Sequence, residues 1–286
     1  MAKLTYIKKQ IALIREIERI TNTMKTISAV RLRIGRGSFE KARAFSEHLG
    51  RILGIIGPFK QTQKEKRLLV GIFPDRGLVG GFSDVLGQHV LRFLESGKPQ
   101  ETKVIVLGSQ GKRVLRHLGE KIIATHPLPV HRVPHYRDVR DLTYTIFNMY
   151  KQGEFSQIFV SFMRYVSITQ HYPLIEQLIP PPSPEKDVAL LQERYLFLSD
   201  TKNLYQSLLF EYLAGKLYGS LAEGFMSEQA TRFMLMDSAT THARETLETL
   251  SLLYAKKRQE KITQELNEVT GASEALRKFA WEERYG

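Results

Sequence analysis

Residues 233–254, FMLMDSATTHARETLETLSLLY, carry the pattern that decides the fold of this chain. Apolar or small side chains recur there at alternating steps of three and four residues: Phe233, Met236, Thr240, Ala243, Leu247, Leu250 and Tyr254. This heptad spacing favours a left-handed coiled coil. No proline follows Pro184, so the pattern predicts a helix from about residue 204 to residue 276, more than ~100 Å long.

The seam is interrupted further along this helix. Lys257 and Lys261 fall where apolar residues are due, and they would be poor core residues. Apolar residues resume off-register at Ile262, Leu266 and Val269.

The other end of the chain also reads as one long helix. No proline precedes Pro58, and a helix is predicted over about residues 3–56. Its apolar residues follow one another at steps of three or four and predict a single buried stripe: Leu4, Ile7, Ile11, Ile14, Ile17, Ile20, Met24, Ile27, Val30 and Ile34. An isolated helix gains little stability from propensity alone, so the two terminal helices are expected to pair antiparallel.

The middle of the chain alternates short apolar runs with helical patterns. Short apolar runs at 67–73, 103–108, 121–124, 157–162 and 194–199 read as strands, and helical patterns lie near 82–96, 110–118 and 137–151. The proline-rich stretch 179–184 reads as an extended connector before the last strand. The prediction is an α/β fold: a long antiparallel coiled coil of the N- and C-terminal helices plus a central Rossmann-like α/β domain with a mainly parallel sheet. The expected domains are residues 1–60, 67–200 and 204–286.

Composition narrows the function classes. There are no cysteines, which excludes disulfides and thiolate catalysis, and no apolar run reaches the length of a transmembrane helix. The net charge is +12, and residues 1–60 hold thirteen Lys or Arg against four acids. Such a segment suits an acidic partner, whether nucleic acid, an anionic membrane or an acidic protein surface; the alternative is a solvated helix face.

A glycine-rich turn is the clearest candidate for a ligand site. The segment PDRGLVGGF, 74–82, follows a predicted strand and opens a predicted helix, a position that suits a phosphate loop. Its glycines match neither G-x-G-x-x-G nor G-x-x-x-x-G-K-[ST]. A purely structural strand-to-helix turn is therefore favoured over a nucleotide site.

Other candidate sites are weaker. His131 and His135 are four residues apart, but Pro134 interrupts any helix between them, so a metal site is disfavoured. Asp138 and Asp141 are expected to cap or solvate a helix start. The cluster 256–258, KKR, is either a solvated face or a contact with an acidic partner, and the partner reading is preferred because the cluster interrupts a regular seam.

Three segments together resemble the gamma chain family of the rotary ATP synthase. They are ITNTMKTISAVRLR at 20–33, DRGLVGGF at 75–82 and SEQATRFMLMDSAT at 227–240, the last continued by RQEKITQELNE at 258–268. The resemblance spans nearly the whole chain in the right order. Val79 stands where the family commonly has cysteine, and ten residues, 277–286, follow the family's usual ending.

The resemblance implies a central rotor stalk that transmits torque between a membrane ring and a catalytic hexamer. Implied partners are the alpha and beta subunits, the epsilon subunit and the membrane c-ring, with no catalytic site, cofactor or metal of its own. By resemblance the beta-subunit contacts are Met24, Lys25, Arg232, Arg258, Gln259 and Thr263. The turn residues Asp75, Arg76, Gly77, Gly80 and Gly81 are then structural. The implied location is the cytoplasmic face of the cell membrane, or an equivalent energy-coupling membrane, as a peripheral component.

Two other functions stay open from the residues alone. One is a basic coiled-coil protein that binds nucleic acid, motivated by the charge of residues 1–60. The other is a small α/β nucleotide-binding enzyme that uses the turn at 74–82. Neither requires two very long helices.

Overall fold

The computed structural model describes residues 2–56, 66–96, 102–129, 132–181 and 201–285. Its chain forms two compact units. The first, here the paired-helix unit, contains the two terminal helices as far as Met24 and from Met236 onward. The second, here the sheet unit, comprises residues 25–235.

Both long terminal helices are present. Helix α1 spans Ala2–Ile56 and helix α6 spans Thr201–Tyr285, which confirms the two predicted helices and extends the second. None of the described helices is long and apolar enough to cross a membrane. Helices of this length depend on tertiary burial rather than on propensity, so each needs a packed face.

In the paired-helix unit the two helices run antiparallel. The hydroxyls of Thr21 and Thr240 lie 2.9 Å apart in a buried position, and Arg244 donates to Glu18 at 2.9 Å. The residue number falls along α1 as it rises along α6, which defines the direction. Met236, Thr240 and Ala243 are buried, as the heptad pattern predicts.

Within the sheet unit small residues bring α1 and α6 close together. A side chain added at Gly35 would lie 3.2 Å from the Cγ of Met226, and one added at Gly50 would lie 3.3 Å from the ring of Tyr212. These pairs again run antiparallel. Glycine is therefore used here for close approach of two helices rather than for a turn.

Beyond Ile14 the predicted apolar stripe of α1 is wrong except at Met24, which is half-buried. Its later aliphatic residues are 40% to 54% exposed: Ile17, Ile20, Ile27, Val30 and Ile34. In their place Thr21, Ser28 and Gly35 are buried. Repeated steps of three residues rotate the apolar stripe away from the seam, because a helix needs about 3.6 residues for each turn.

The sheet has five strands in the order β3-β2-β1-β4-β5. They are β1 Arg67–Ile72, β2 Thr102–Leu107, β3 Ile122–His126, β4 Gln157–Tyr165 and β5 His171–Ile179. Strand β1 pairs in parallel with β2 and β4, and β3 joins β2 in parallel, which confirms the mainly parallel sheet.

Strand β5 is an addition to the prediction. It pairs antiparallel with β4, so the sheet is mixed. The sequence did not predict this strand because it contains Pro173 and several polar residues, and proline argues against a strand. The predicted strand at 194–199 and the end of the proline-rich connector lie outside the described residues.

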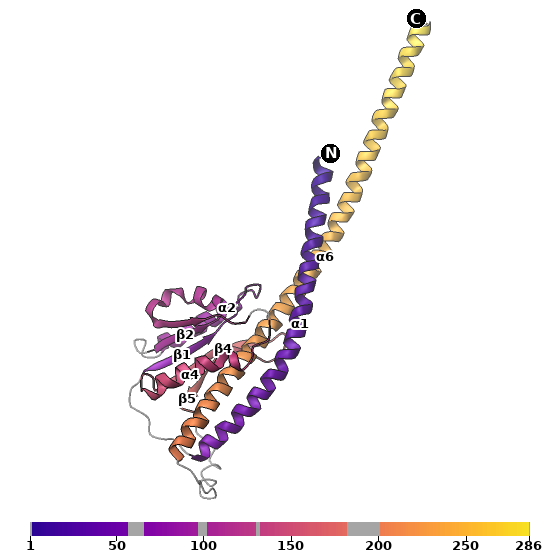
Figure 1. Cartoon of the computed structure of the whole chain (residues 1–286). Helices are drawn as coiled ribbons and strands as arrows, with labels where there is room; N and C mark the ends of the chain where they lie inside the picture. Colours follow the sequence, from indigo (N-terminus) through magenta and orange to yellow (C-terminus); the bar gives the residue numbers. More distant parts are fainter. Residues whose placement is uncertain (1, 57–65, 97–101, 130–131, 182–200, 286) are drawn as a thin grey trace. The chain divides into compact units, whose positions relative to one another are not determined.

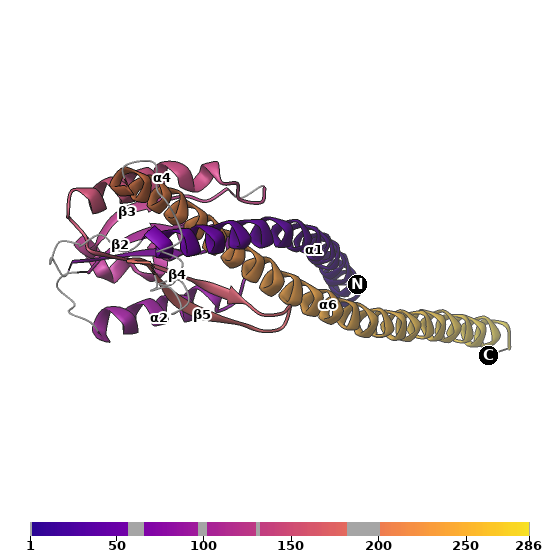
Figure 2. The ribbon, with the colours of Figure 1, turned by 90° about the horizontal axis from the view of Figure 1, so that it is seen from below.

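Helices cover both faces of the sheet (Figures 1 and 2). Helix α2, Phe82–Ser96, and the short α3, Ser109–Val114, pack on one face over a core that includes Leu69, Val104 and Leu115. The 3-10 helix η1, Arg116–Lys121, follows α3, so the predicted helix at 110–118 is broken in two. The other face carries α4, Arg137–Lys151, and α6.

Two glycine substitutions test the packing. Gly108 has φ of 91°, and a Cβ there would lie 2.0 Å from the carbonyl oxygen of Phe73. We expect Gly108→Ala to lower the free energy of unfolding by more than about 2 kcal/mol. Gly37, in α1, has nothing within 4 Å of its added Cβ. Gly37→Ala should instead raise it by up to about 1 kcal/mol. Denaturant unfolding of the two variants gives both values, and equal effects would contradict this packing.

Candidate functional site

The carboxyl ends of β1 and β4 mark the natural place for a site in this sheet. The chain passes from β1 to β2 and β3 on one side, whereas β4 lies on the other side of β1. In open α/β sheets ligands bind in the crevice at such a switch point. The glycine-rich turn 74–81 leaves β1 at this crevice.

Asp75 holds the turn against the neighbouring loop. Its Oδ1 accepts hydrogen bonds from the backbone N–H of Ser109 at 2.9 Å and from the Ser109 hydroxyl at 2.7 Å. Burial raises the pKa of Asp75, but the hydrogen bonds from Ser109 and Leu128, together with the charge of Arg76, leave the pKa below its usual value. The N–H of Ser109 is thus already occupied by a carboxylate of the protein itself.

Helix α6 packs against the same strand ends and against the turn. Gly224 lies over the ends of both strands, with an added Cβ 3.6 Å from Ile72 and 3.7 Å from Phe162. At the turn, Arg232 donates to the carbonyl of Gly77 at 3.2 Å. Gly80 adopts a positive φ of 55°, and its added Cβ would lie 3.3 Å from Leu235. At these points the protein's own helix makes the contacts with the turn.

Arg232 also forms a largely buried ion pair. Its Nη1 lies 2.7 Å from Oε1 of Glu228, one helical turn earlier, and the two side chains are 7% and 14% exposed. Burial raises the pKa of Glu228, and the guanidinium of Arg232 opposes that rise. Sequence reasoning placed Arg232 at a partner surface; within this chain its contacts are with Glu228 and the glycine turn.

The remaining predicted contact residues are spread along the two helices. Met24 and Lys25 are half-buried on α1. Arg258, Gln259 and Thr263 are exposed on α6, where the Thr263 hydroxyl donates to the Gln259 carbonyl at 3.1 Å. Arg76 is exposed on the turn.

The lysines that interrupt the seam have partners on their own helix. Lys257 pairs with Glu260 and Lys261 with Glu265, and both lysines are half-buried.

No group of metal-binding side chains gathers within the described ranges. Of the two histidines considered for a metal, His131 lies outside those ranges. Asp138 accepts from the backbone N–H of His135 at 2.7 Å and pairs with Arg132. Asp138 lies in the first turn of α4 and ties the preceding loop to it, while the N-cap residue, Tyr136, makes no side-chain capping bond.

The sequence analysis did not single out three residues that lie at this crevice. Glu223 and Ser227 of α6 and His171 of β5 all make polar contacts between α6 and the β4–β5 hairpin. The helix position of the first two was predictable, but their partners Met163 and Tyr165 lie beyond the end of the predicted strand 157–162 and about 60 residues earlier in the chain, so no local pattern links them. His171 was missed because β5 was not recognised.

Together these observations define a structural α/β protein whose ligand crevice is closed by its own C-terminal helix. The family model described as ATP synthase matches residues 3–276. The chain belongs to this family, that of the non-catalytic ATP synthase gamma chain.

Solved structures share the fold. A chain of the Tetrahymena thermophila mitochondrial ATP synthase central stalk and c-ring matches with a TM-score of 0.60 and 18% identity, covering 77% of this chain and 99% of that one. A chain of the Euglena gracilis mitochondrial enzyme matches with a TM-score of 0.68 and 14% identity, covering 96% and 95%. A chain of the Euglena rotor matches with a TM-score of 0.63 and 14% identity, covering 91% and 99%.

Removal of Arg232 should be strongly destabilising. Arg232→Ala leaves Glu228 buried without its cation and removes the bond to Gly77, and we expect a loss of about 3–5 kcal/mol in the free energy of unfolding. The double variant Arg232→Met, Glu228→Met removes both charges and should recover much of that loss. Urea unfolding measures both, and a double variant as unstable as the single one would refute a buried pair.

His171 predicts a specific pH dependence of stability. Its ring nitrogen Nε2 lies 3.2 Å from the Thr231 hydroxyl, and burial lowers the pKa of this histidine below its ordinary value of about 6.5. The unfolded chain then binds the proton more readily, so stability present above about pH 6.5 is lost as the pH falls through the lower folded value. Thermal melts of His171→Gln should show a smaller loss between neutral and acidic pH than melts of the unaltered chain.

Proposed function

We propose that this chain is the central rotor stalk of an ATP synthase. It carries torque between a membrane ring driven by ion flow and a catalytic hexamer of alpha and beta subunits, and so couples ion translocation to ATP synthesis or hydrolysis. Its own crevice performs no chemistry, because α6 occupies it.

One observation carries this proposal: the later part of α6 presents an apolar row that nothing among the described residues covers. Ile262, Leu266, Val269 and Leu276 are 47% to 71% exposed along one helix. Steps of four, three and seven residues keep them on one side. A water-exposed helix with such a row needs an apolar sleeve, and the hexamer interior supplies one.

The beta subunits are the proposed partners of the exposed polar residues. Arg258, Gln259 and Thr263 lie within about one and a half turns of α6. Among the described residues Arg258 has no ionic partner, which suits contact with an acidic loop. Met24 and Lys25 of α1 are proposed to meet acidic beta-subunit loops in the same way. Arg232 is likewise proposed to contact a beta-subunit loop.

The remaining partners follow from the family. We propose that the domain at residues 67–200 meets the epsilon subunit and the c-ring, while residues 1–60 and 204–286 form the coiled-coil parts. The proposed location is the cytoplasmic face of the cell membrane or an equivalent energy-coupling membrane. No nucleic acid partner is proposed.

Torque transfer follows from asymmetry. A single chain without threefold symmetry contacts three chemically equal beta subunits differently, so each rotational position favours a different conformation at each catalytic site. An effector shifts an equilibrium only by its difference in affinity for the two states. Exposed basic side chains against acidic loops provide contacts that hold and then release.

Arg258 gives a sharp test of the proposed contact. Arg258→Ala should weaken the binding of this chain to the alpha–beta ring by about tenfold, or ~1.4 kcal/mol. Arg140→Ala, on the exposed side of α4, removes the same charge from the sheet unit and should have little effect. Titration of alpha–beta rings with each purified variant measures both affinities, and equal losses would argue against the assigned contact.

The proposed rotor function is tested by leaving this chain out of a reconstituted complex. Vesicles that contain all other subunits should hydrolyse ATP without pumping ions, and addition of this chain should restore pumping. Full pumping in its absence would reject the rotor role.

A further inference from the structure

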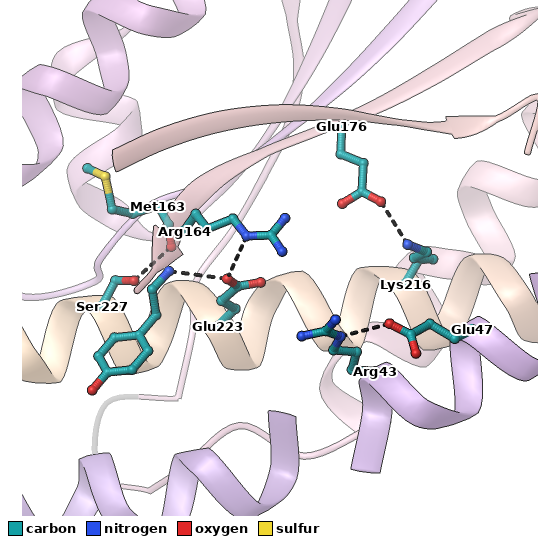
Figure 3. A network of polar contacts seen from close by, with 9 residues as sticks. Arg43, Glu47, Met163, Arg164, Glu176, Lys216, Glu223 and Ser227 are labelled. Carbon is teal, nitrogen blue, oxygen red and sulfur yellow. Dashed lines mark hydrogen bonds and ion pairs between the residues drawn. The ribbon is translucent and has the colours of Figure 1, made fainter. Parts of the chain in front are cut away.

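One side of α6 carries a row of polar residues that faces the β4–β5 hairpin. The row consists of Lys216, Glu223, Ser227 and Thr231, which are separated by seven, four and four residues. Such steps place side chains on a common helix face. Figure 3 shows the first three of them with their contacts.

Each member of the row has a partner in the hairpin. Lys216 donates to Glu176 of β5 at 2.7 Å. Glu223 accepts from the backbone N–H of Tyr165 at 3.2 Å and lies 3.4 Å from Nε of Arg164. These contacts join α6 to both strands of the hairpin.

The other two members continue the row. The Ser227 hydroxyl donates to the Met163 carbonyl at 2.8 Å, and the Thr231 hydroxyl lies 3.2 Å from Nε2 of His171. Met163 is close to the end of β4, and His171 begins β5. The row is therefore concentrated where β4 ends and β5 begins.

Among the described residues, the α1 ion pair beside this row lies within α1 itself. In Figure 3 Arg43 of α1 pairs with Glu47 of the same helix, at 2.7 Å, while Lys216 and Glu223 of α6 reach the hairpin. The described polar contacts thus tie the hairpin to α6.

These contacts resist rotation more than apolar packing does. The rest of α6 packs on the sheet through apolar residues such as Leu209, Leu213 and Leu217. Apolar burial is non-directional, so its free energy changes little when two packed surfaces slide past each other. Hydrogen bonds weaken steeply when donor and acceptor are misaligned. Ser227 is fully buried and Glu223 is 5% exposed, so a twist of α6 would leave buried polar groups without partners.

We infer that the β4–β5 hairpin is the element through which torque passes between α6 and the α/β sheet. This inference rests on the proposed rotor function. It assigns to the two strands together the task of holding α6 in a fixed rotational setting: β4 through Glu223 and Ser227, and β5 through Lys216 and Thr231.

The test measures ion pumping for each ATP hydrolysed by the whole complex in vesicles. Lys216→Glu places like charges at the Glu176 contact and should lower this ratio on the order of two- to tenfold. The swap Lys216→Glu, Glu176→Lys restores opposite charges and should restore the ratio. Ser227→Ala removes one bond without a new charge and should lower the ratio less.

The control is Arg113→Glu. Arg113 lies 3.6 Å from Asp84 in an ion pair between α3 and α2, away from α6, so this charge reversal should leave the ratio unchanged. An unaltered ratio in both Lys216→Glu and Ser227→Ala, or a swap that fails to restore it, overturns the inference. If Lys216→Glu does not fold, Ser227→Ala and Glu176→Gln decide the question in the same way. Absence of pumping in the unaltered complex would instead reject the rotor function itself.

Discussion

The closure of the switch-point crevice by α6 is the constraint on which the sheet unit depends. Arg232 binds the turn after β1, Ser227 binds the end of β4, and Gly224 allows the helix to approach both strands. A doubly wound sheet ordinarily leaves this place open for a ligand. Here the helix makes hydrogen bonds and apolar contacts of the kind that a ligand makes in related folds. The same place in the sheet therefore anchors a helix.

Much of this fold was predictable because helices and buried parallel strands have strong local periodicity. The heptad seam from Met236 to Ala243 and the apolar strands β1, β2 and β4 were recognised for that reason. Strand β5 was not, because Pro173 and its half-exposed residues lack a buried pattern. The stripe of α1 was misplaced because the partner helix selects small residues such as Thr21 and Gly35, and apolarity alone does not reveal that choice.

Some residues of the candidate site were predictable from the sequence, but the contacts between them were not. The glycine turn was interpreted as structural because its spacing fits no phosphate loop, and it is held by Ser109 and Arg232 of the same chain. That Arg232 would bind its Gly77 carbonyl, 155 residues away, depends on the tertiary course of α6. No sequence pattern distinguished Glu223 or His171. Burial between α6 and the β4–β5 hairpin raises the pKa of Glu223 and lowers the pKa of His171.

The two faces of the sheet differ in what they touch. The core under α2 is built from residues such as Leu86, Val90 and Val106, and no side chain of α1 or α6 belongs to it among the described residues. Met163 belongs to this core, and its carbonyl accepts the hydrogen bond from Ser227 of α6, so this residue links the two layers. Apolar cores tolerate hydrophobic substitutions that keep their total volume, which is one way for such a fold to persist in chains that share only 14% to 18% of their residues.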